Sequence, residues 1–172
     1  MKSVDIEGLR LVSVPSFIDD RGTFMRVFDS EYSLAGIAEQ VNVSINPQLR
    51  TLRGMHFQTS GQPENKIVSL LSGSVYIAII DLRKESSTYL TVFEASFKYE
   101  DKLSFSIPAG CATGWISLTD NTILHYVMSS RFEENSYSGL RFDDPAFKIN
   151  WPNSPLHISK QDLNWPNFKS ES

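Results

Sequence analysis

The sequence predicts an all-β fold, a jelly-roll-like barrel made of a double antiparallel sheet with one or two short helices. Turn residues recur about every ten positions, the runs between them are rich in Val, Ile, Phe, Tyr and Thr, and helical periodicity is scarce. A closed double sheet leaves few exposed strand edges and encloses an interior that can hold a ligand. The 172 residues, 41% of them hydrophobic, fit a single domain spanning residues 1–172.

The turns and the alternation of apolar residues define the expected elements. The expected strands are residues 9–14, 23–28, 41–46, 51–58, 89–98, 103–107, 112–118 and 122–129, with a hairpin at 66–83 around Ser72, Gly73 and Ser74. The first two strands flank the turn sequence IDDRG. Short helices are expected at 30–40, beginning at Ser30, and at 160–163 within a tail rich in Pro, Asn and Trp. We expect this tail to wrap the sheet as an ordered loop.

Charge and cysteine usage exclude several classes of protein. The net charge of -4, with scattered Lys and Arg residues, argues against a general binder of nucleic acid or membrane surfaces, because such binding needs a basic field. Cys111 is the single cysteine, so no intrachain disulfide can form, and a reducing compartment is expected. The amino terminus has no apolar run of signal-peptide length, and no stretch approaches a membrane span. The sequence therefore predicts a soluble, cytoplasmic protein.

The strand at 51–58, TLRGMHFQ, carries polar groups where core residues are expected. Apolar residues surround Arg53 and His56, and Gly54 interrupts the run. Arg53 and His56 have opposite parity, so both can face one cavity only if the strand kinks. Gly54 is a natural site for a β-bulge, and we therefore predict one there.

The remaining motifs favour acid–base chemistry without a metal. His56, His125 and His157 lack the spacing of metal ligands, and the chain has no Walker loop, dinucleotide-binding glycine pattern or Gly-x-Ser-x-Gly elbow. Cys111 could act as a nucleophile only beside a histidine, and a free cysteine is more often a small buried hydrophobe. A strand histidine paired with a carboxylate can act as a base, with Asp162 or Asp81 as the candidate partner.

A tyrosine across the cavity could then supply a proton, and a lysine could neutralise an oxyanion. Each of these residues also has a purely structural explanation. A lone strand histidine is usually a satisfied structural group, a strand tyrosine usually packs in the core, and a lysine at the start of a strand is usually solvated.

The order of motifs along the chain resembles the dTDP-4-dehydrorhamnose 3,5-epimerase family from residue 4 to about 166. The similarity is carried by DDRGTFMRVF, EQVNVSIN, TLRGMHFQ, PENKIVSLLSGSVYIAIIDLR, LSFSIPAGCATGWISL, HYVMSSRF, LRFDDPAFKINWP and ISKQDLNWP. It implies a homodimeric, cupin-like jelly-roll barrel. It also implies an isomerase that acts without metal or cofactor on nucleoside-diphosphate 4-keto-6-deoxy sugars for surface polysaccharides such as lipopolysaccharide or capsule.

The same resemblance implies roles for individual residues. His56 matches the catalytic base, Asp162 its carboxylate partner, Tyr126 the acid on the other face and Lys66 the group that stabilises the enolate oxygen. Residues that match the nucleotide-sugar site, partly across the dimer, are Arg53, Arg21, Phe24, Gln40, Asn42 and Ser44. Of these, Gln40, Asn42 and Ser44 share parity along one strand and should project together.

Three positions depart from the family pattern. Thr113 and Trp115 lie in CATGW, where the family usually has Phe-Ala-His-Gly-Phe, so Thr113 replaces a histidine near the enolate and Trp115 replaces a phenylalanine of the pocket wall. Arg26 stands where the family usually has glutamate. These changes leave three alternatives open: an epimerase of C3 or C5 alone, a GDP- or CDP-linked substrate, and a non-catalytic sugar-nucleotide-binding barrel. A metal-dependent cupin oxygenase or isomerase is a further rival.

Overall fold

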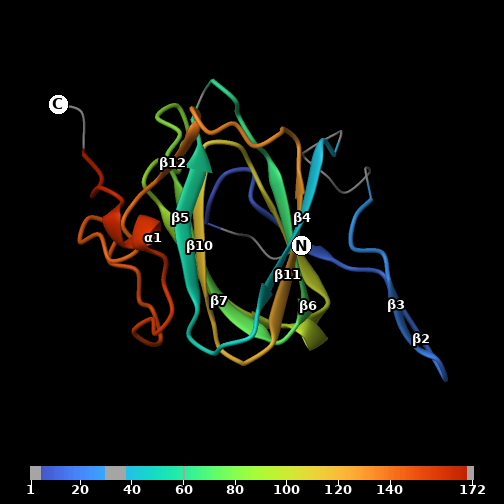
Figure 1. Cartoon of the computed structure of the whole chain (residues 1–172). Helices are drawn as coiled ribbons and strands as arrows, with labels where there is room; N and C mark the ends of the chain where they lie inside the picture. The colour runs from blue at the N-terminus through green and yellow to red at the C-terminus, as the bar shows by residue number, and fades with distance from the viewer. Residues whose placement is uncertain (1–4, 30–37, 60, 170–172) are drawn as a thin grey trace.

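The computed structural model describes residues 5–29, 38–59 and 61–169, which form a jelly-roll-like barrel of two facing antiparallel sheets (Figure 1). In order across the first sheet lie β1 (Arg10–Ser13), β9 (Leu103–Ile107), β6 (Lys66–Ser72), β11 (Thr122–Met128) and β4 (Gln40–Asn46). In order across the second lie β12 (Tyr137–Gly139), β5 (Leu52–Gln58), β10 (Cys111–Ser117), β7 (Ser74–Asp81) and β8 (Val92–Lys98). This arrangement confirms the predicted fold class.

The space between the two sheets is filled by side chains that alternate along the strands. The predicted hairpin is formed by β6 and β7, and its inward residues Val68, Leu70, Val75, Ile77 and Ile79 belong to one buried cluster. Burial of these side chains away from water is the main force that holds the sheets together. Lys66 shares the inward face of β6 with Val68, but it lies at the end of the core and lines a pocket there.

A second apolar cluster lies on the outer face of the second sheet. Both faces of β7 are therefore buried, which explains why its sequence is a continuous apolar run. Ala78 and Ile80 pack there against Met55, and side chains of the carboxyl-terminal tail such as Phe147 and Trp151 cover them. The tail lies beside β5 in Figure 1 and contains the short helix α1 (Lys160–Asn164), close to the predicted 160–163. Among the residues that the structure describes, no helix is long and apolar enough to cross a bilayer.

A two-stranded arm departs from the prediction for the amino-terminal region. Strands β2 (Ser16–Asp19) and β3 (Gly22–Met25) pair with each other and project away from the barrel at the right of Figure 1. Residues 9–14 were expected to be the strand before IDDRG, but that strand is β2, whereas β1 is the edge strand of the first sheet and pairs with β9. The arm is a local hairpin closed by the same turn.

Three smaller differences concern single elements. The strand expected at 89–98 begins at Val92, because Leu90 and Thr91 form a turn whose backbone hydrogen bonds return to Asp81 and Thr88. Strand β12 and a short 3₁₀ helix, η2 (Tyr99–Asp101), were not predicted. The helix expected at 30–40 lies mostly outside the described residues, which omit 30–37.

Candidate active site

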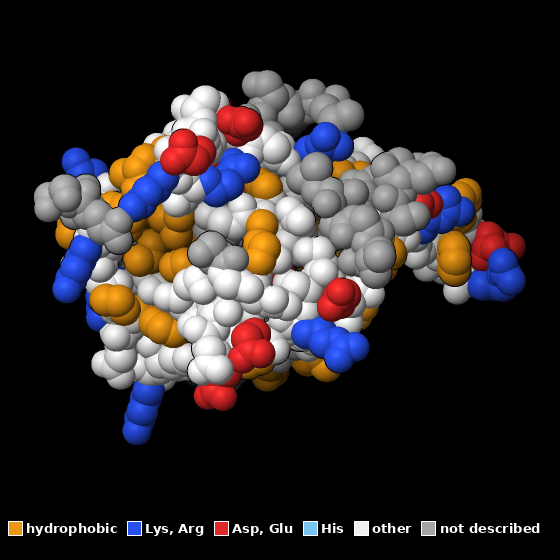
Figure 2. Space-filling model, turned by 90° about the horizontal axis from the view of Figure 1, so that it is seen from above, with side chains coloured by type: hydrophobic (Ala, Val, Ile, Leu, Met, Phe, Trp, Pro, Cys, Tyr) orange, Lys and Arg blue, Asp and Glu red, His pale blue; other side chains and the backbone are white. Residues whose placement is uncertain are grey.

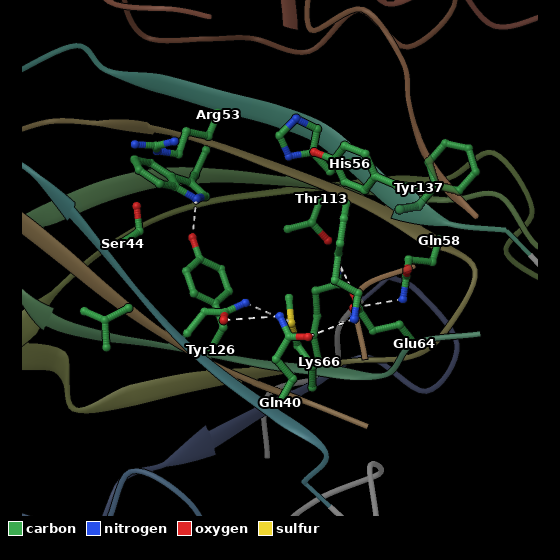
Figure 3. A pocket seen from close by; sticks show the side chains of 16 residues that line it. Gln40, Ser44, Arg53, His56, Gln58, Glu64, Lys66, Thr113, Tyr126 and Tyr137 are labelled. Atoms are coloured by element: carbon green, nitrogen blue, oxygen red, sulfur yellow. Dashed lines mark hydrogen bonds and ion pairs between the residues drawn. The ribbon is translucent and has the colours of Figure 1, made fainter. Parts of the chain in front are cut away.

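A pocket of about 320 Å³ opens between the two sheets at the end of the core, and Figure 3 shows its lining. This volume lies within the range of small-molecule sites. Its lining residues are Gln40, Asn42, Val43, Ser44, Arg53, His56, Phe57, Gln58, Glu64, Lys66, Thr113, Trp115, Tyr126, Met128, Phe132 and Tyr137. The pocket therefore combines aromatic surface with charged and titratable groups from both sheets.

His56 and Asp162 form a hydrogen-bonded pair on the side of the second sheet. Nε2 of His56 lies 2.6 Å from Oδ1 of Asp162, which is only 4% exposed. Trp165 Nε1 also donates to this carboxylate over 3.3 Å. Burial alone would raise the pKa of Asp162, but the hydrogen bonds from His56, the Gly54 backbone and Trp165 outweigh burial and hold the pKa of this carboxyl below its usual value.

The local structure explains how residues 106 positions apart meet. Ser159 caps the amino terminus of α1, accepting a hydrogen bond from the Asp162 backbone N–H, and α1 contacts β5. The other predicted partner, Asp81, instead accepts hydrogen bonds from Arg83, Ser86 and Thr88. With the His56 Nε2–H held by Asp162, Nδ1 is the ring nitrogen with a lone pair for a ligand.

Tyr126 lies on β11 of the first sheet and faces the histidine across the pocket (Figure 3). Burial raises the pKa of Tyr126, while a hydrogen bond from Trp115 and the charge of Arg53 partly oppose this rise. A second tyrosine of the pocket, Tyr137, lies on β12 beside β5, on the same side as His56. Tyr126 is therefore the tyrosine placed on the wall opposite the imidazole.

Lys66 reaches the pocket from the start of β6. Its Nζ lies 3.0 Å from Oε1 of Glu64, and Gln58 Nε2 donates to the other carboxylate oxygen over 3.2 Å. Pocket residues that were not predicted from the sequence are Val43, Phe57, Gln58, Glu64, Met128, Phe132 and Tyr137. Glu64 lies just before the hairpin expected at 66–83, and its spacing of two residues from Lys66 could have indicated a shared face.

Strand β5 carries the predicted bulge. His56 pairs with Thr113 of β10, whereas Arg53 pairs with Trp115, so three steps on β5 span two on β10. This extra residue cancels the difference in parity, and both Arg53 and His56 line the pocket. Gly54 has φ +144, and a Cβ there would lie 2.4 Å from the backbone Cα of Gly114.

The rest of the pocket matches the sequence expectation in part. Gln40, Asn42 and Ser44 line it together from β4, as their shared parity predicted. Thr113 and Trp115 line it from β10. The Thr113 hydroxyl is buried and has no hydrogen-bond partner among the described residues, so it is available to a ligand.

Three predicted binding residues do not reach this pocket within one chain. Phe24 is 70% exposed on the arm, and the Arg21 guanidinium pairs with Asp19 at 2.6 Å. Arg26 directly follows the arm and pairs with Asp29 at 3.4 Å. Their predicted role across a dimer stays a prediction.

Cys111 does not have the setting of a nucleophile. It is 2% exposed in the core, and burial raises its thiol pKa to about 12. The charges that act on it belong to Arg83, Asp81 and Lys66 rather than to a histidine. In the described part of the chain, no three His, Cys, Asp or Glu side chains are grouped so that they could hold a metal ion.

Comparison with known proteins gives one consistent result. A family model described as dTDP-4-dehydrorhamnose 3,5-epimerase matches residues 3–170. The dTDP-4-dehydrorhamnose 3,5-epimerase of Sinorhizobium fredii (strain NBRC 101917 / NGR234) is 30% identical in an alignment 172 positions long. The alignment covers 97% of this chain and 88% of the relative.

Solved structures are similar over nearly the whole barrel. The dTDP-4-dehydrorhamnose 3,5-epimerase from Bacillus anthracis str. Ames, with TDP and PPi bound, has a TM-score of 0.86 at 28% identity and 94% coverage of both chains. A double mutant of a 3'-monoepimerase from Streptomyces bikiniensis, in complex with dTDP, has a TM-score of 0.85 at 25% identity and covers 97% of this chain and 86% of that one.

Proposed function

Because this chain belongs to the dTDP-4-dehydrorhamnose 3,5-epimerase family, we propose that its pocket inverts C3, C5 or both of a nucleoside-diphosphate 4-keto-6-deoxy sugar. The observation that carries this proposal is the opposition of two proton-transfer groups across one pocket. The His56–Asp162 pair lies on one sheet, and Tyr126 lies on the other. A pocket that only binds a sugar nucleotide has no need of a base and an acid on opposed walls. The product would serve surface-polysaccharide synthesis.

The mechanism follows from the chemistry of a ketone. The C4 carbonyl acidifies the hydrogens on C3 and C5, because the carbanion left behind delocalises onto the C4 oxygen. His56 takes the proton at Nδ1, and the Lys66 ammonium, held by Glu64, stabilises the enolate oxygen. Tyr126 then donates a proton to the opposite face of the same carbon, and the stereocentre inverts. Asp162 orients the imidazole and stabilises its protonated form.

The substrate's two ends are bound by different parts of the pocket. We assign the nucleoside diphosphate to Arg53, Gln40, Asn42 and Ser44, which give a cation and polar side chains along β5 and β4. The unpartnered Thr113 hydroxyl comes from β10, where Thr113 pairs with His56 of the neighbouring strand β5. We assign this hydroxyl to a hydrogen bond with the sugar. We also propose a cytoplasmic location.

Incubation with dTDP-4-keto-6-deoxyglucose in deuterated water tests the reaction. We expect NMR to show deuterium incorporated at C3, C5 or both, together with inversion at the exchanged carbon. Competition by dTDP, GDP, CDP and UDP identifies the nucleotide, and dTDP is expected to bind most tightly. If no 4-keto sugar of any preferred nucleotide exchanges a proton, the pocket is a binding site and the proposal is wrong.

The number of exchanged positions separates the two epimerase candidates. Thr113 stands where the family usually has histidine, and a neighbour in structure is a 3'-monoepimerase. Exchange at both carbons identifies a 3,5-epimerase. Exchange at one carbon, persisting at long incubation and high enzyme concentration, identifies a single-centre enzyme.

We also propose that two chains form a homodimer in which each arm contributes to the partner's site. Apolar side chains are exposed on the arm, where Phe17, Ile18 and Phe24 are 58–77% exposed, and on the edge strand β4, at Val41, Val43 and Ile45. Figure 2 shows hydrophobic side chains along the arm and charged ones at its end. Exposed apolar rows of this kind mark association surfaces. The arm also carries Arg21 and Phe24, which do not reach their own pocket.

Mixing two inactive variants tests the shared site. Light scattering should give the mass of two chains. His56→Asn removes the base, and Arg21→Ala with Phe24→Ala weakens the arm, so each homodimer should have low activity. In a mixed dimer one intact pocket meets one intact arm, and activity should recover after subunit exchange. Recovery that fails although mass analysis shows mixed dimers would contradict a shared site, and a monomer at micromolar concentration would contradict the dimer itself.

A further inference from the structure

A hydrogen bond joins the two walls of the pocket at Tyr126. The Trp115 Nε1–H of β10 donates to the Tyr126 hydroxyl of β11 over 2.8 Å, and these strands belong to different sheets. Trp115 is only 3% exposed, so water does not compete with this bond at the indole. Figure 3 shows the bond as a dashed line between the walls. The larger aromatic residue therefore does more than fill the pocket wall.

The bond constrains the tyrosine in two ways. A phenol oxygen accepts through its lone pairs and donates one proton, so the indole N–H occupies an acceptor position and leaves the O–H free to point elsewhere. When the proton leaves, the phenolate keeps a donor already in place. Because burial disfavours a phenolate here, a fixed donor lowers the energy of the step that forms it. Phenylalanine, which the family usually has at this position, cannot supply it.

We propose that Trp115 is a positioning residue for the return of the proton by Tyr126, and that it controls inversion more than proton removal. This inference rests on the proposed function. In the first step a C–H bond breaks, its proton goes to His56 and its electron pair delocalises onto the C4 oxygen. In the second step the Tyr126 O–H bond breaks, a C–H bond forms on the opposite face, and the phenolate regains a proton from solvent.

Weakening the second step alone has a recognisable signature. If Tyr126 returns the proton slowly, the enolate persists until His56, having exchanged its proton with solvent, returns a deuteron to the original face. Deuterium then enters the sugar without inversion. The ratio of inversion to exchange therefore reports on the tyrosine side of the pocket, and a general loss of folding or substrate binding does not change it.

The experiment is Trp115→Phe assayed in deuterated water, with exchange and inversion measured on the same sample. We expect the ratio of inversion to exchange to fall about tenfold, as a lost hydrogen bond to a charged group would predict. Trp151→Phe is the matched control, because the Trp151 Nε1–H donates over the same 2.8 Å to the Phe142 carbonyl outside the pocket. That control should leave the ratio unchanged. Replacement of Trp115 by benzothienylalanine removes the N–H while keeping the ring shape, should the phenylalanine variant fold poorly.

A double-mutant cycle with Tyr126→Phe completes the test. If Trp115 acts through Tyr126, Trp115→Phe should have no further effect on the ratio once the phenol is gone. Inversion that falls in Tyr126→Phe but is unchanged in Trp115→Phe overturns this inference alone. Inversion that survives in Tyr126→Phe removes the acid from the proposed function as well. Equal effects of Trp115→Phe with and without the phenol would identify a packing role and contradict the inference.

Discussion

Replacing His56 with asparagine should lower the rate of deuterium incorporation into the 4-keto sugar by about 10³-fold or more. Asparagine can keep a hydrogen bond to Asp162, but its amide cannot take a proton from carbon. General acid–base catalysis contributes about 10²–10⁴-fold, and here proton removal begins every turnover. Nucleotide affinity should change less than about threefold, because Arg53, Gln40 and Asn42 lie elsewhere on the pocket wall.

Exchange measured by NMR and nucleotide binding measured by calorimetry check this expectation together. His125→Asn is the matched control: His125 neighbours Tyr126 on β11, so its side chain points to the other face of the strand, and it does not line the pocket. It should exchange at nearly the normal rate. Exchange that survives in His56→Asn would identify another base, whereas a parallel loss of nucleotide binding would identify His56 as a binding group.

The arrangement of side chains could be predicted where a single strand carried enough information. The parity conflict between Arg53 and His56, with Gly54 between them, was sufficient to predict a bulge, because few other local structures let both side chains face one cavity. Parity along β4 likewise placed Gln40, Asn42 and Ser44 together. These are properties of a strand and its period of two, which the sequence displays directly.

Contacts between segments that lie far apart in the chain could not be predicted from the sequence. The hydrogen bond between Trp115 and Tyr126 depends on the spacing of the two sheets, and nothing in either strand encodes that distance. Without the resemblance, residue types alone left Asp81 and Asp162 equal as partners of His56. In the structure the Asp81 carboxylate accepts hydrogen bonds from residues close to it in sequence, such as Ser86. Asp162, in the carboxyl-terminal tail, is the carboxylate that contacts His56. Local pairing of β2 with β3 was missed because both are four-residue, mostly exposed strands with little burial to fix their ends.

The bulge also predicts a large effect of Gly54→Ala on stability and on the site. Backbone with φ +144 is accessible almost only to glycine, and forcing another residue into such a conformation costs about 1–3 kcal/mol. The added Cβ would lie 2.4 Å from the Cα of Gly114, and because that atom belongs to the backbone of β10 it cannot rotate away. Overpacking of this kind costs a further 1–3 kcal/mol or so. Together they predict a loss of about 4 kcal/mol, or a melting temperature lower by roughly 8–16 °C.

Gly8→Ala is the matched control that separates backbone strain from the steric clash between β5 and β10. Gly8 also has a positive φ, +79, but the nearest atom to its Cβ would be a Pro108 side-chain carbon at 3.7 Å, which is ordinary contact. Its cost should be limited to about 1–2 kcal/mol for the left-handed backbone, with normal exchange activity. Gly54→Ala should lose activity even at temperatures where it is fully folded, because pushing β5 away from β10 moves Arg53 and His56 relative to Tyr126. A Gly54→Ala protein as stable and active as Gly8→Ala would mean that the bulge does not set the geometry of the pocket.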